Sequence, residues 1–527
     1  MLLPRAGRQY CHVLAAVASA AVVGIDAYAV TVEVDAAQGL PQWTIVGLPA
    51  GAVKESRDRV GAALVNGGFA LPPRRLTVNL APADVRKDGT AFDLPIALGV
   101  LAATGQVPPD SIARRLFVGE LGLDGSLRAV RGALPLAQHV ANGGGVDALV
   151  LPRANVAEAS RVSGVRLAAP VDLSELVRWL CDGQLPEPPS PADARPAVSA
   201  DLDWSDVAGQ LAAKRALEIA AAGGHNVLLA GPPGSGKTML ARRLTGILPP
   251  LSEAEALQII AIASVAGILT DDVLADPRRP FRAPHHTTSA AGLIGGGSPP
   301  RPGEVSLAHH GVLFLDEMLE FPRHILDGLR QPMEDGHVVI ARAASAVRFP
   351  ARFSLIAATN PCPCGNAGNP RGVCTCTPTD ARRYRARLSG PLADRIDLHV
   401  QVPSLPIAEL SRGETGESSS RVRERVACAH VRQAARYARL ARSRRNAHVP
   451  GRWIDSHTPV HADARAVLVR ASTRLALSAR GYHRVLKVAR TIADLDGETE
   501  IGPAQISEAL QFRSGAVDAS IGAPPGC

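Results

Sequence analysis

Eight consecutive residues near the middle of the chain have the types and the spacing of a phosphate-binding loop. They match the pattern GxxxxGK(S/T) in full, follow the strand-like run 226–230 and open a helical stretch. The loop consists of Gly231, Pro232, Pro233, Gly234, Ser235, Gly236, Lys237 and Thr238. Its glycines let backbone N–H groups approach phosphate oxygens, Lys237 can reach the β- and γ-phosphates, and Thr238 can ligate Mg²⁺. The loop therefore predicts a site for ATP and Mg²⁺.

Two further apolar runs end in polar residues that suit the same chemistry. The run 312–315 ends in Asp316 and Glu317, and the run 355–358 is followed by Asn360. An open α/β sheet binds ligands at the carboxyl ends of its strands. We therefore expect Asp316 to hold Mg²⁺ through water, Glu317 to act as general base, and Asn360 to orient the attacking water or sense the γ-phosphate. The alternatives are an exposed acidic strand end and an ordinary turn residue.

Phosphoryl transfer also needs a positive charge near the γ-phosphate, and such an arginine raises the rate by about 10³ to 10⁵. The candidates are Arg395, within the segment 389–397, and Arg480, in the C-terminal part of the chain. From the pattern alone, either could be an arginine in a surface ion pair.

Four of the eight cysteines lie in the segment 361–377, as Cys362-x-Cys364 and Cys374-x-Cys376. Four sulfurs suit tetrahedral Zn²⁺, and the glycines and prolines between the pairs make the segment pliable. A structural zinc is therefore expected. Because the usual spacing within a pair is two to four residues, the match is imperfect, and reduced free thiols or disulfides are the alternatives.

The chain that positions these residues is too long for one hydrophobic core. At 527 residues, a prior of about 100–200 residues per domain suggests about three domains. Hydrophobic residues make up 46% and charged residues 20%, an ordinary globular balance. The net charge of +8 permits a phosphate-rich partner, but only 3% aromatic residues leave few stacking platforms for single-stranded nucleic acid.

The start of the chain imitates a secretory signal, because Arg5 and Arg8 precede the apolar run 13–23. The run continues into the alternating strand 30–34, so cleavage would remove part of a sheet. No other stretch reaches the roughly 18 apolar residues that a membrane helix needs. We expect a cytoplasmic protein, with no membrane partner.

Composition divides the chain into segments of different character. β-Branched runs alternate with Ala-rich helical stretches up to about residue 180, prolines then crowd the next segment, and the last quarter is rich in Ala, Arg and Leu. The expected units are an α+β domain (1–180), a Pro-rich linker (181–200), an α/β core with a parallel sheet (201–405), a polar connector (406–420), a helical lid domain (421–515) and a tail (516–527).

Longer segments resemble a known family. The stretch 282–290, continuing through 295–297 and 300–304 to 313–317, closely resembles the YifB/ComM family of magnesium-chelatase-like AAA+ ATPases. The segments 360–365 and 489–495 extend this resemblance, which covers the chain from about residue 20 to 513.

The resemblance implies a homo-hexameric ring in which Arg395 of one subunit enters the ATP site of its neighbour. Arg480 would act as the second sensor on the lid, with Arg484 as the fallback for that role. ComM-like members are understood as DNA helicases that drive branch migration while transformed single-stranded DNA is integrated into the chromosome. Single-stranded or branched DNA is the partner that the resemblance implies.

Such a motor needs pore loops that grip the phosphate backbone with cations or hydrogen-bond donors. The candidates are the Gly-rich insertion 285–303 and the hairpin-like segment 338–348, with packing or interdomain contact as the alternative. Two histidine pairs have no carboxylate partner at ligand spacing and are expected to be structural or pore-loop residues. They are His285, His286, His309 and His310.

The segments 82–98 and 117–125 resemble the proteolytic domain of Lon, an S5 domain 2-like fold, so peptidase activity has to be considered. Lon-type peptidases use a Ser–Lys dyad. The Ser position corresponds here to Ala91, and the Lys position falls on or near Leu134. Neither side chain can act as nucleophile or base, so we expect a scaffold or interaction module and no peptidase activity.

The sequence thus favours a DNA-translocating ATPase. One alternative is a magnesium-chelatase motor subunit, which would insert Mg²⁺ into a porphyrin with partner subunits. Against it stands the Lon-like domain, which chelatase motor subunits are not expected to carry. The other alternative is a chaperone-like or regulatory ATPase.

Overall fold

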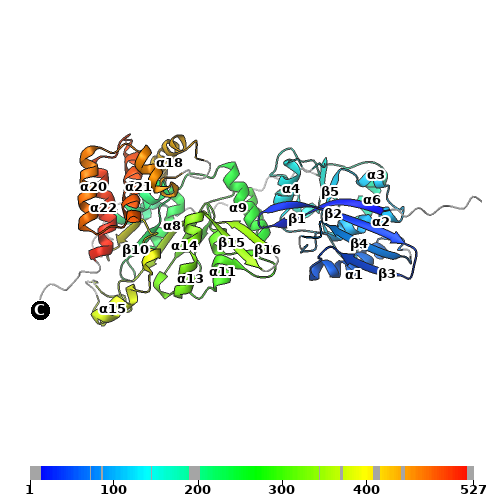
Figure 1. The fold of residues 1–527 in the computed structure, drawn as a ribbon, viewed down its shortest axis with the longest axis horizontal. Helices are drawn as coiled ribbons and strands as arrows, with labels where there is room; N and C mark the ends of the chain where they lie inside the picture. The colour runs from blue at the N-terminus through cyan, green and yellow to red at the C-terminus, as the bar shows by residue number, and fades with distance from the viewer. Residues whose placement is uncertain are drawn as a thin grey trace, which may run out of the picture.

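The computed structural model describes residues 14–71, 73–84, 87–143, 145–188, 202–342, 345–367, 369, 372–406, 416–440 and 445–518. An N-terminal domain runs from β1 (Leu14–Val23) to α6 (Leu173–Cys181), and a core domain from η2 (Trp204–Asp206) to β18 (Leu398–Gln401). The C-terminal helices, from α18 (Ser419–Arg436) to α22 (Pro503–Asp518), lie at the end farthest from the N-terminal domain (Figure 1). The predicted linker, connector and tail fall largely on 189–201, 407–415 and 519–527, outside the described residues, as does the segment 1–13.

The N-terminal domain is built on a mixed seven-stranded sheet in the order β3-β4-β2-β1-β5-β8-β9. Strand β2 (Asp26–Ala37) alternates as its sequence predicts, with Val30, Val32 and Val34 buried. Helix α2 (Asp93–Ala103) is buried along its whole length, and Gly99 permits this because a Cβ there would lie 2.4 Å from Val34 Cγ2. The remaining elements are β3 Gln42–Val46, α1 Gly51–Asn66, β4 Arg75–Ala81, α3 Pro109–Ile112, β5 Arg115–Phe117, β6 Glu120–Leu121, β7 Leu127–Arg128, α4 Ala133–Ala141, β8 Ala148–Val150, η1 Arg153–Asn155, α5 Val156–Ala159 and β9 Leu167–Ala168.

A five-stranded, all-parallel sheet in the order β11-β14-β17-β10-β18 forms the centre of the core domain. Its strands are short apolar runs because helices cover them. The central strands are β10 Val227–Ala230, β14 Val312–Leu315 and β17 Ser354–Thr359. The other elements are α7 Leu211–Gly223, α8 Lys237–Ile247, α9 Glu253–Ala266, α10 Asp271–Ala275, β11 Phe281–Arg282, α11 Ala290–Ile294, β12 Gly295–Gly296, β13 Arg301–Pro302, α12 Glu304–Leu307, η3 Met318–Glu320, α13 Arg323–Gly328, α14 Arg330–Asp335, β15 His337–Arg342, β16 Ser345–Pro350, α15 Pro378–Arg385 and α16 Gly390–Ala393.

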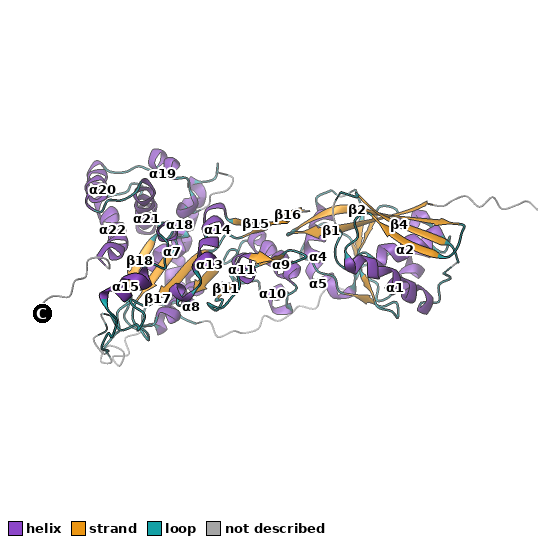
Figure 2. Ribbon diagram, turned by 60° about the horizontal axis from the view of Figure 1, so that its bottom comes forward, coloured by secondary structure: helices purple, strands orange, loops and turns teal. Residues whose placement is uncertain are grey.

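The C-terminal helices pack directly on the core domain. Val485 and Ile492 belong to the same hydrophobic cluster as Val227 and Ile356 of the parallel sheet. Figure 2 shows these helices gathered beside β18. They include η4 Asn446–His448, α19 Gly451–His457, α20 Ala462–Arg474 and α21 Ala479–Asp496. The predicted fold class is confirmed: an α+β domain, a parallel α/β core and a helical C-terminal part. Across the described ranges, no helix combines the length and the apolar character needed to cross a bilayer.

Contacts at α4 and at the turn between β1 and β2 join the N-terminal domain to the core domain. Leu134 of α4 is fully buried and packs against Ile260 and Ala261 of α9, and the Gly132 N–H donates to Ser264 Oγ at 2.8 Å. The β15–β16 ribbon faces the β1–β2 end of the N-terminal sheet (Figure 1). A Cβ at Gly24, in the turn between β1 and β2, would lie 2.5 Å from the Arg348 carbonyl oxygen. Interdomain contact, the alternative predicted for the segment 338–348, is therefore observed.

Candidate functional site

The phosphate-binding loop lies between the end of β10 and the start of α8, in the predicted position. Gly231 must be a glycine, because a Cβ there would lie 2.2 Å from the Val402 carbonyl oxygen. Gly236 precedes the helix with φ 89°, a left-handed conformation that favours glycine. The first turn of α8 thus points its free N–H groups and the positive end of the helix dipole toward the loop, an arrangement that binds phosphates.

Lys237, the seventh residue of the phosphate-binding loop, is buried. Its ammonium group donates to the carbonyl oxygens of Gly231 at 2.6 Å and Pro232 at 2.9 Å. It also lies 3.4 Å from Asn360 Oδ1. Burial lowers the pKa of Lys237, although Asp316 and Glu317 oppose this. The ammonium group is therefore held close to the position that a bound phosphate would occupy.

The predicted magnesium ligands touch each other. Thr238 Oγ1 donates to Asp316 Oδ2 at 2.8 Å, and the Glu317 N–H donates to Asp316 Oδ1 at 3.0 Å. The Glu317 side chain is 54% exposed and its backbone has φ 48°. Both carboxylates line a cavity of about 270 Å³ together with Thr238 and Arg242. A hydroxyl and a carboxylate beside a solvent-facing glutamate suit Mg²⁺ and a water molecule.

Asn360 directly follows β17, which lies between β14 and β10 in the sheet. The three polar strand ends therefore meet at one edge because the strands are parallel neighbours. The structure brings together the phosphate loop, Asp316, Glu317 and Asn360, as the sequence predicts. Their catalytic roles stay predictions.

The predicted arginines lie in different surroundings. Arg395 is buried, and its guanidinium contacts Glu334 Oε1 at 2.6 Å and the Pro391 carbonyl oxygen at 2.7 Å, within its own subunit. Arg480 is exposed in the first turn of α21. Arg484, the fallback, forms an ion pair with Asp397 and donates to the Arg395 carbonyl oxygen at 3.1 Å. The structure does not bring these arginines to the phosphate loop of the same chain by any contact among the described residues.

Asp397 is a buried residue that the sequence pattern did not single out. Burial alone would raise the pKa of its carboxyl, but the charge of Arg484 and the imidazole of His225, whose Nδ1 lies 3.4 Å from Asp397 Oδ2, hold that pKa well below its ordinary value. The Asn226 N–H, just before β10, also donates to Asp397 at 3.0 Å. This carboxylate therefore joins the central sheet, the segment that carries Arg395 and the C-terminal helices.

Folding brings carboxylates from distant segments near two of the four histidines, although among the described residues neither histidine joins a metal-ligand group. His286 Nδ1 lies 4.0 Å from Glu317 Oε2 and lines the same cavity. His310 Nδ1 lies 3.6 Å from Glu255 Oε1. His309 is buried and accepts a hydrogen bond from the Arg352 N–H at 2.9 Å, which fits a structural role. The motif 283–286, which carries the family resemblance, was the signal that could have placed His286 at the site.

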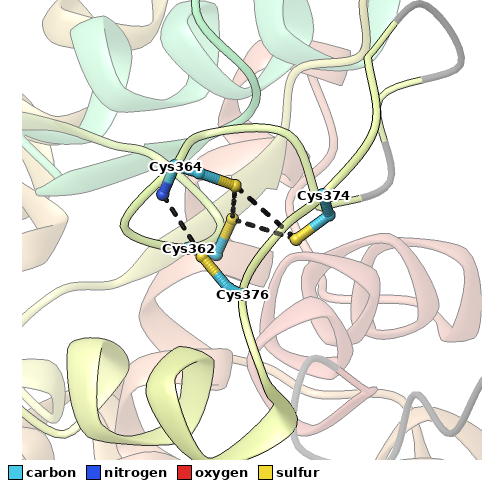
Figure 3. A group of neighbouring side chains, drawn as sticks. All are labelled: Cys362, Cys364, Cys374 and Cys376. Carbon is cyan, nitrogen blue, oxygen red and sulfur yellow. Dashed lines mark hydrogen bonds between the residues drawn. The ribbon is translucent and has the colours of Figure 1, made fainter.

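The four cysteines of the segment 361–377, which we name the cysteine loop, converge on one point between β17 and α15 (Figure 3). Their sulfurs all lie within 4.8 Å of one another, at 3.4 Å for Cys362 and Cys364, 3.7 Å for Cys362 and Cys374, and 3.6 Å for Cys364 and Cys374. These separations exceed the roughly 2.05 Å of a disulfide bond. The group can hold a metal ion.

Comparison with known proteins covers almost the whole chain. A family model described as magnesium chelatase, subunit ChlI, matches residues 203–410, its C-terminal counterpart matches 416–513, and a model described as subunit ChlI of Mg-chelatase matches 32–155. The chain is 44% identical over 504 residues to the uncharacterized protein YifB of Salmonella typhimurium, and 44% identical over 511 residues to the competence protein ComM of Haemophilus influenzae. Each of these matches spans 95% of this chain and 97% of the relative. The magnesium-chelatase 38 kDa subunit of Rhodobacter capsulatus is 28% identical over 174 residues, which is 30% of this chain and 50% of that subunit.

Proposed function

This chain belongs to the YifB/ComM family of magnesium-chelatase-like AAA+ proteins, and we propose that it is an ATP-driven motor that moves branched DNA. The observation that carries the proposal is the assembled nucleotide site. Thr238 contacts Asp316, Lys237 approaches Asn360, and Glu317 faces the same cavity. The end-to-end similarity to the competence protein ComM supports DNA as the substrate.

In the proposed reaction, Lys237 exchanges its bonds to loop carbonyls for charged phosphate oxygens, which accept stronger hydrogen bonds. Thr238 and Asp316 would hold Mg²⁺, whose charge would offset that of the β- and γ-phosphates. Glu317 accepts the proton of the attacking water, since its exposed carboxylate faces the cavity. Asn360 donates from its amide to that water or to the γ-phosphate.

We assign the arginine that would face the γ-phosphate to a neighbouring subunit. Arg395 is bonded to Glu334 and Pro391 in its own chain and has no contact with the phosphate loop among the described residues. We therefore propose a hexameric ring in which Arg395 completes the site of the next subunit, with Arg480 as the second sensor. A ring also provides the central pore through which a motor can pull DNA.

DNA contact in the pore is assigned to the two predicted loops. Arg301 in the insertion 285–303 and Arg348 in β16 are exposed cations of the kind that grip a phosphate backbone without sequence preference. Homologous recombination during natural transformation is the process in which we place such a motor, in the cytoplasm, where ATP is available. A structural zinc in the cysteine loop completes the proposed cofactors.

Of the two arguments against the magnesium-chelatase alternative, the one from coverage holds and the one from the N-terminal domain does not. The N-terminal domain does not argue against it, because the model that matches residues 32–155 is itself described as a chelatase subunit. Coverage does argue against it, since the chelatase subunit matches 30% of this chain while ComM matches 95%. A regulatory or chaperone-like ATPase is favoured by no specific feature of the site.

The proposal is tested with synthetic three-way and four-way DNA junctions. Purified hexamers should convert them to migrated products with ATP and Mg²⁺, and the Lys237→Ala variant should not. Wild-type hexamers that hydrolyse ATP rapidly yet leave every junction intact would refute the DNA motor and leave the ATPase assignment standing.

A further inference from the structure

The cysteine loop presses directly on the phosphate-binding loop. Gly365, between the two cysteine pairs, has φ 79°, and a Cβ there would lie 2.7 Å from Pro233 Cγ and 2.8 Å from Pro233 Cδ. The same Cβ would lie 4.0 Å from Asn360 Cγ. The backbone at Gly365 therefore lies against Pro233 with no room for a Cβ between them.

The first cysteine of the loop is anchored beside Asn360. Cys362 follows Asn360 by two residues and is fully buried. Because Asn360 Oδ1 lies 3.4 Å from Lys237 Nζ, a shift of Cys362 would be transmitted to the lysine of the phosphate loop through one short segment. The cysteine loop thus contacts the phosphate loop at Pro233, and in the chain it follows directly after Asn360.

Three of the four sulfurs have separations close to those that zinc requires, and the fourth, Cys376 Sγ, lies within 4.8 Å of each of them. A tetrahedron with Zn–S bonds of about 2.3 Å has S–S edges of roughly 3.8 Å. The separations among Cys362, Cys364 and Cys374, at 3.4, 3.6 and 3.7 Å, lie close to that edge. No carboxylate or histidine joins the group among the described residues, so the donor set is four sulfurs, which selects Zn²⁺ over Mg²⁺.

Backbone donors also surround the sulfurs as they do in metal–thiolate sites. The Cys364 N–H donates to Cys376 Sγ at 3.4 Å, and the Ala367 N–H donates to Cys362 Sγ at 3.3 Å. Such bonds orient thiolate ligands and offset the negative charge that four thiolates leave around one divalent ion.

We propose that Cys362, Cys364, Cys374 and Cys376 bind Zn²⁺ and that the zinc-closed loop fixes Pro233 and Asn360 in the geometry that ATP needs. This inference rests on the proposed nucleotide site and adds to it a metal requirement. Zinc is not a reactant here. Its binding would tie Cys362 and Cys364 to Cys374 and Cys376, and so fix Gly365, which lies against Pro233 of the phosphate loop.

The metal is tested first on the full-length wild-type chain. Elemental analysis should find about one zinc per chain, and exchange with Co²⁺ should give the visible absorption of a tetrahedral cobalt–thiolate site. Cys374→Ser should lose the metal, whereas Cys428→Ser, which removes an exposed cysteine of α18, should keep it. Wild-type protein that carries no zinc and gives no cobalt–thiolate absorption overturns the inference, whatever its ATPase activity.

The coupling is tested with a variant that keeps all four ligands. Gly365→Ala forces a methyl group against Pro233, so it should retain its zinc while binding of a fluorescent ATP analogue and ATP turnover fall by about 10- to 100-fold. Gly164→Ala is the matched control, because Gly164 has a similar φ of 78° and a Cβ there meets nothing within 4 Å. Zinc-loaded Gly365→Ala with normal nucleotide binding overturns the coupling. Loss of junction migration alone, with zinc and coupling intact, would instead refute the DNA motor.

Discussion

Mixed rings provide a direct test of whether Arg395 acts on the neighbouring subunit. Lys237→Ala destroys the phosphate loop but keeps Arg395, and Arg395→Ala does the reverse. Each variant alone should lose ATP turnover by about 10³-fold or more. In a random 1:1 mixture, half the subunits keep a working loop and half of their neighbours keep Arg395. About a quarter of the wild-type activity should therefore return in a closed ring.

The local contacts of Arg395 show that it can be released for this role. Its partner Glu334 is 45% exposed while Arg395 itself is 9% exposed, so one end of this ion pair reaches solvent. The catalytic gain from an arginine on the γ-phosphate is about 10³ to 10⁵, or roughly 4–7 kcal/mol. Arg395 Nε is also buried without a hydrogen-bond partner among the described residues, so its own chain does not satisfy the guanidinium fully. The unsatisfied Nε leaves this guanidinium a donor that a neighbouring γ-phosphate could accept from.

The assay measures phosphate release from mixtures prepared at several ratios, with Glu334→Gln as a matched variant that frees Arg395. Glu334→Gln should keep ATP turnover or raise it by up to about fivefold, the equivalent of 1 kcal/mol. No recovery in the 1:1 mixture would refute action in the neighbouring site. Equal loss in Glu334→Gln and Arg395→Ala would mean that the pair is structural.

Three further outcomes follow from single contacts. Glu317→Gln should keep ATP binding but lose turnover by about 10²- to 10⁴-fold, and turnover within twofold of wild type would reject the general base. Leu134→Ala should lower the free energy of unfolding in urea by about 2–5 kcal/mol, because Leu134 is buried between the two domains. The control, Leu123→Ala at an exposed position, should change it by no more than about 0.5 kcal/mol. Equal effects of the two substitutions would contradict the interdomain packing. Burial lowers the pKa of His310 to about 4, so this imidazole stays neutral in the folded state while the unfolded chain binds a proton below about pH 6.5. The contribution of His310 to the free energy of unfolding is therefore fully present above that pH. This contribution falls by roughly 1 kcal/mol between pH 7.5 and 5.5. Asparagine tolerates the φ of 58° found at His310, so His310→Asn should fold. In urea titrations this variant should lose roughly 1 kcal/mol less free energy of unfolding between pH 7.5 and 5.5 than the wild type. An unchanged pH dependence would reject the assignment of this loss to His310.

The nucleotide site was predictable because each of its parts is a local pattern. A short apolar run that ends in Asp316 and Glu317, or in Asn360, is a strand whose polar end must lie at the carboxyl edge of a parallel sheet. Neighbouring parallel strands then bring these ends together without any knowledge of long-range contacts. The cysteine pairs were likewise visible, although only folding shows that their four sulfurs meet.

The contacts between distant segments were not predictable from the pattern. Arg395 and Glu334 are separated by 61 positions, and His286 meets Glu317 only because the insertion folds back over the sheet. The packing of Leu134 on α9 joins two domains, and one sequence carries no local sign of it. The C-terminal helices were predicted as a lid domain, but tertiary packing gives them a hydrophobic cluster in common with the central sheet.

The segment 395–397 carries both Arg395, which is proposed to act on the neighbouring subunit, and Asp397, which binds the C-terminal helices. Arg484 of α21 holds Asp397 and the Arg395 carbonyl oxygen, and Arg513 of α22 donates to the Ile396 carbonyl oxygen at 2.9 Å. The C-terminal helices therefore position the backbone from which Arg395 projects. In a ring, any movement of these helices that accompanies ATP turnover in one subunit would move the arginine offered to the next subunit. Turnover around the ring would then be sequentially coupled through Asp397 rather than through the DNA alone.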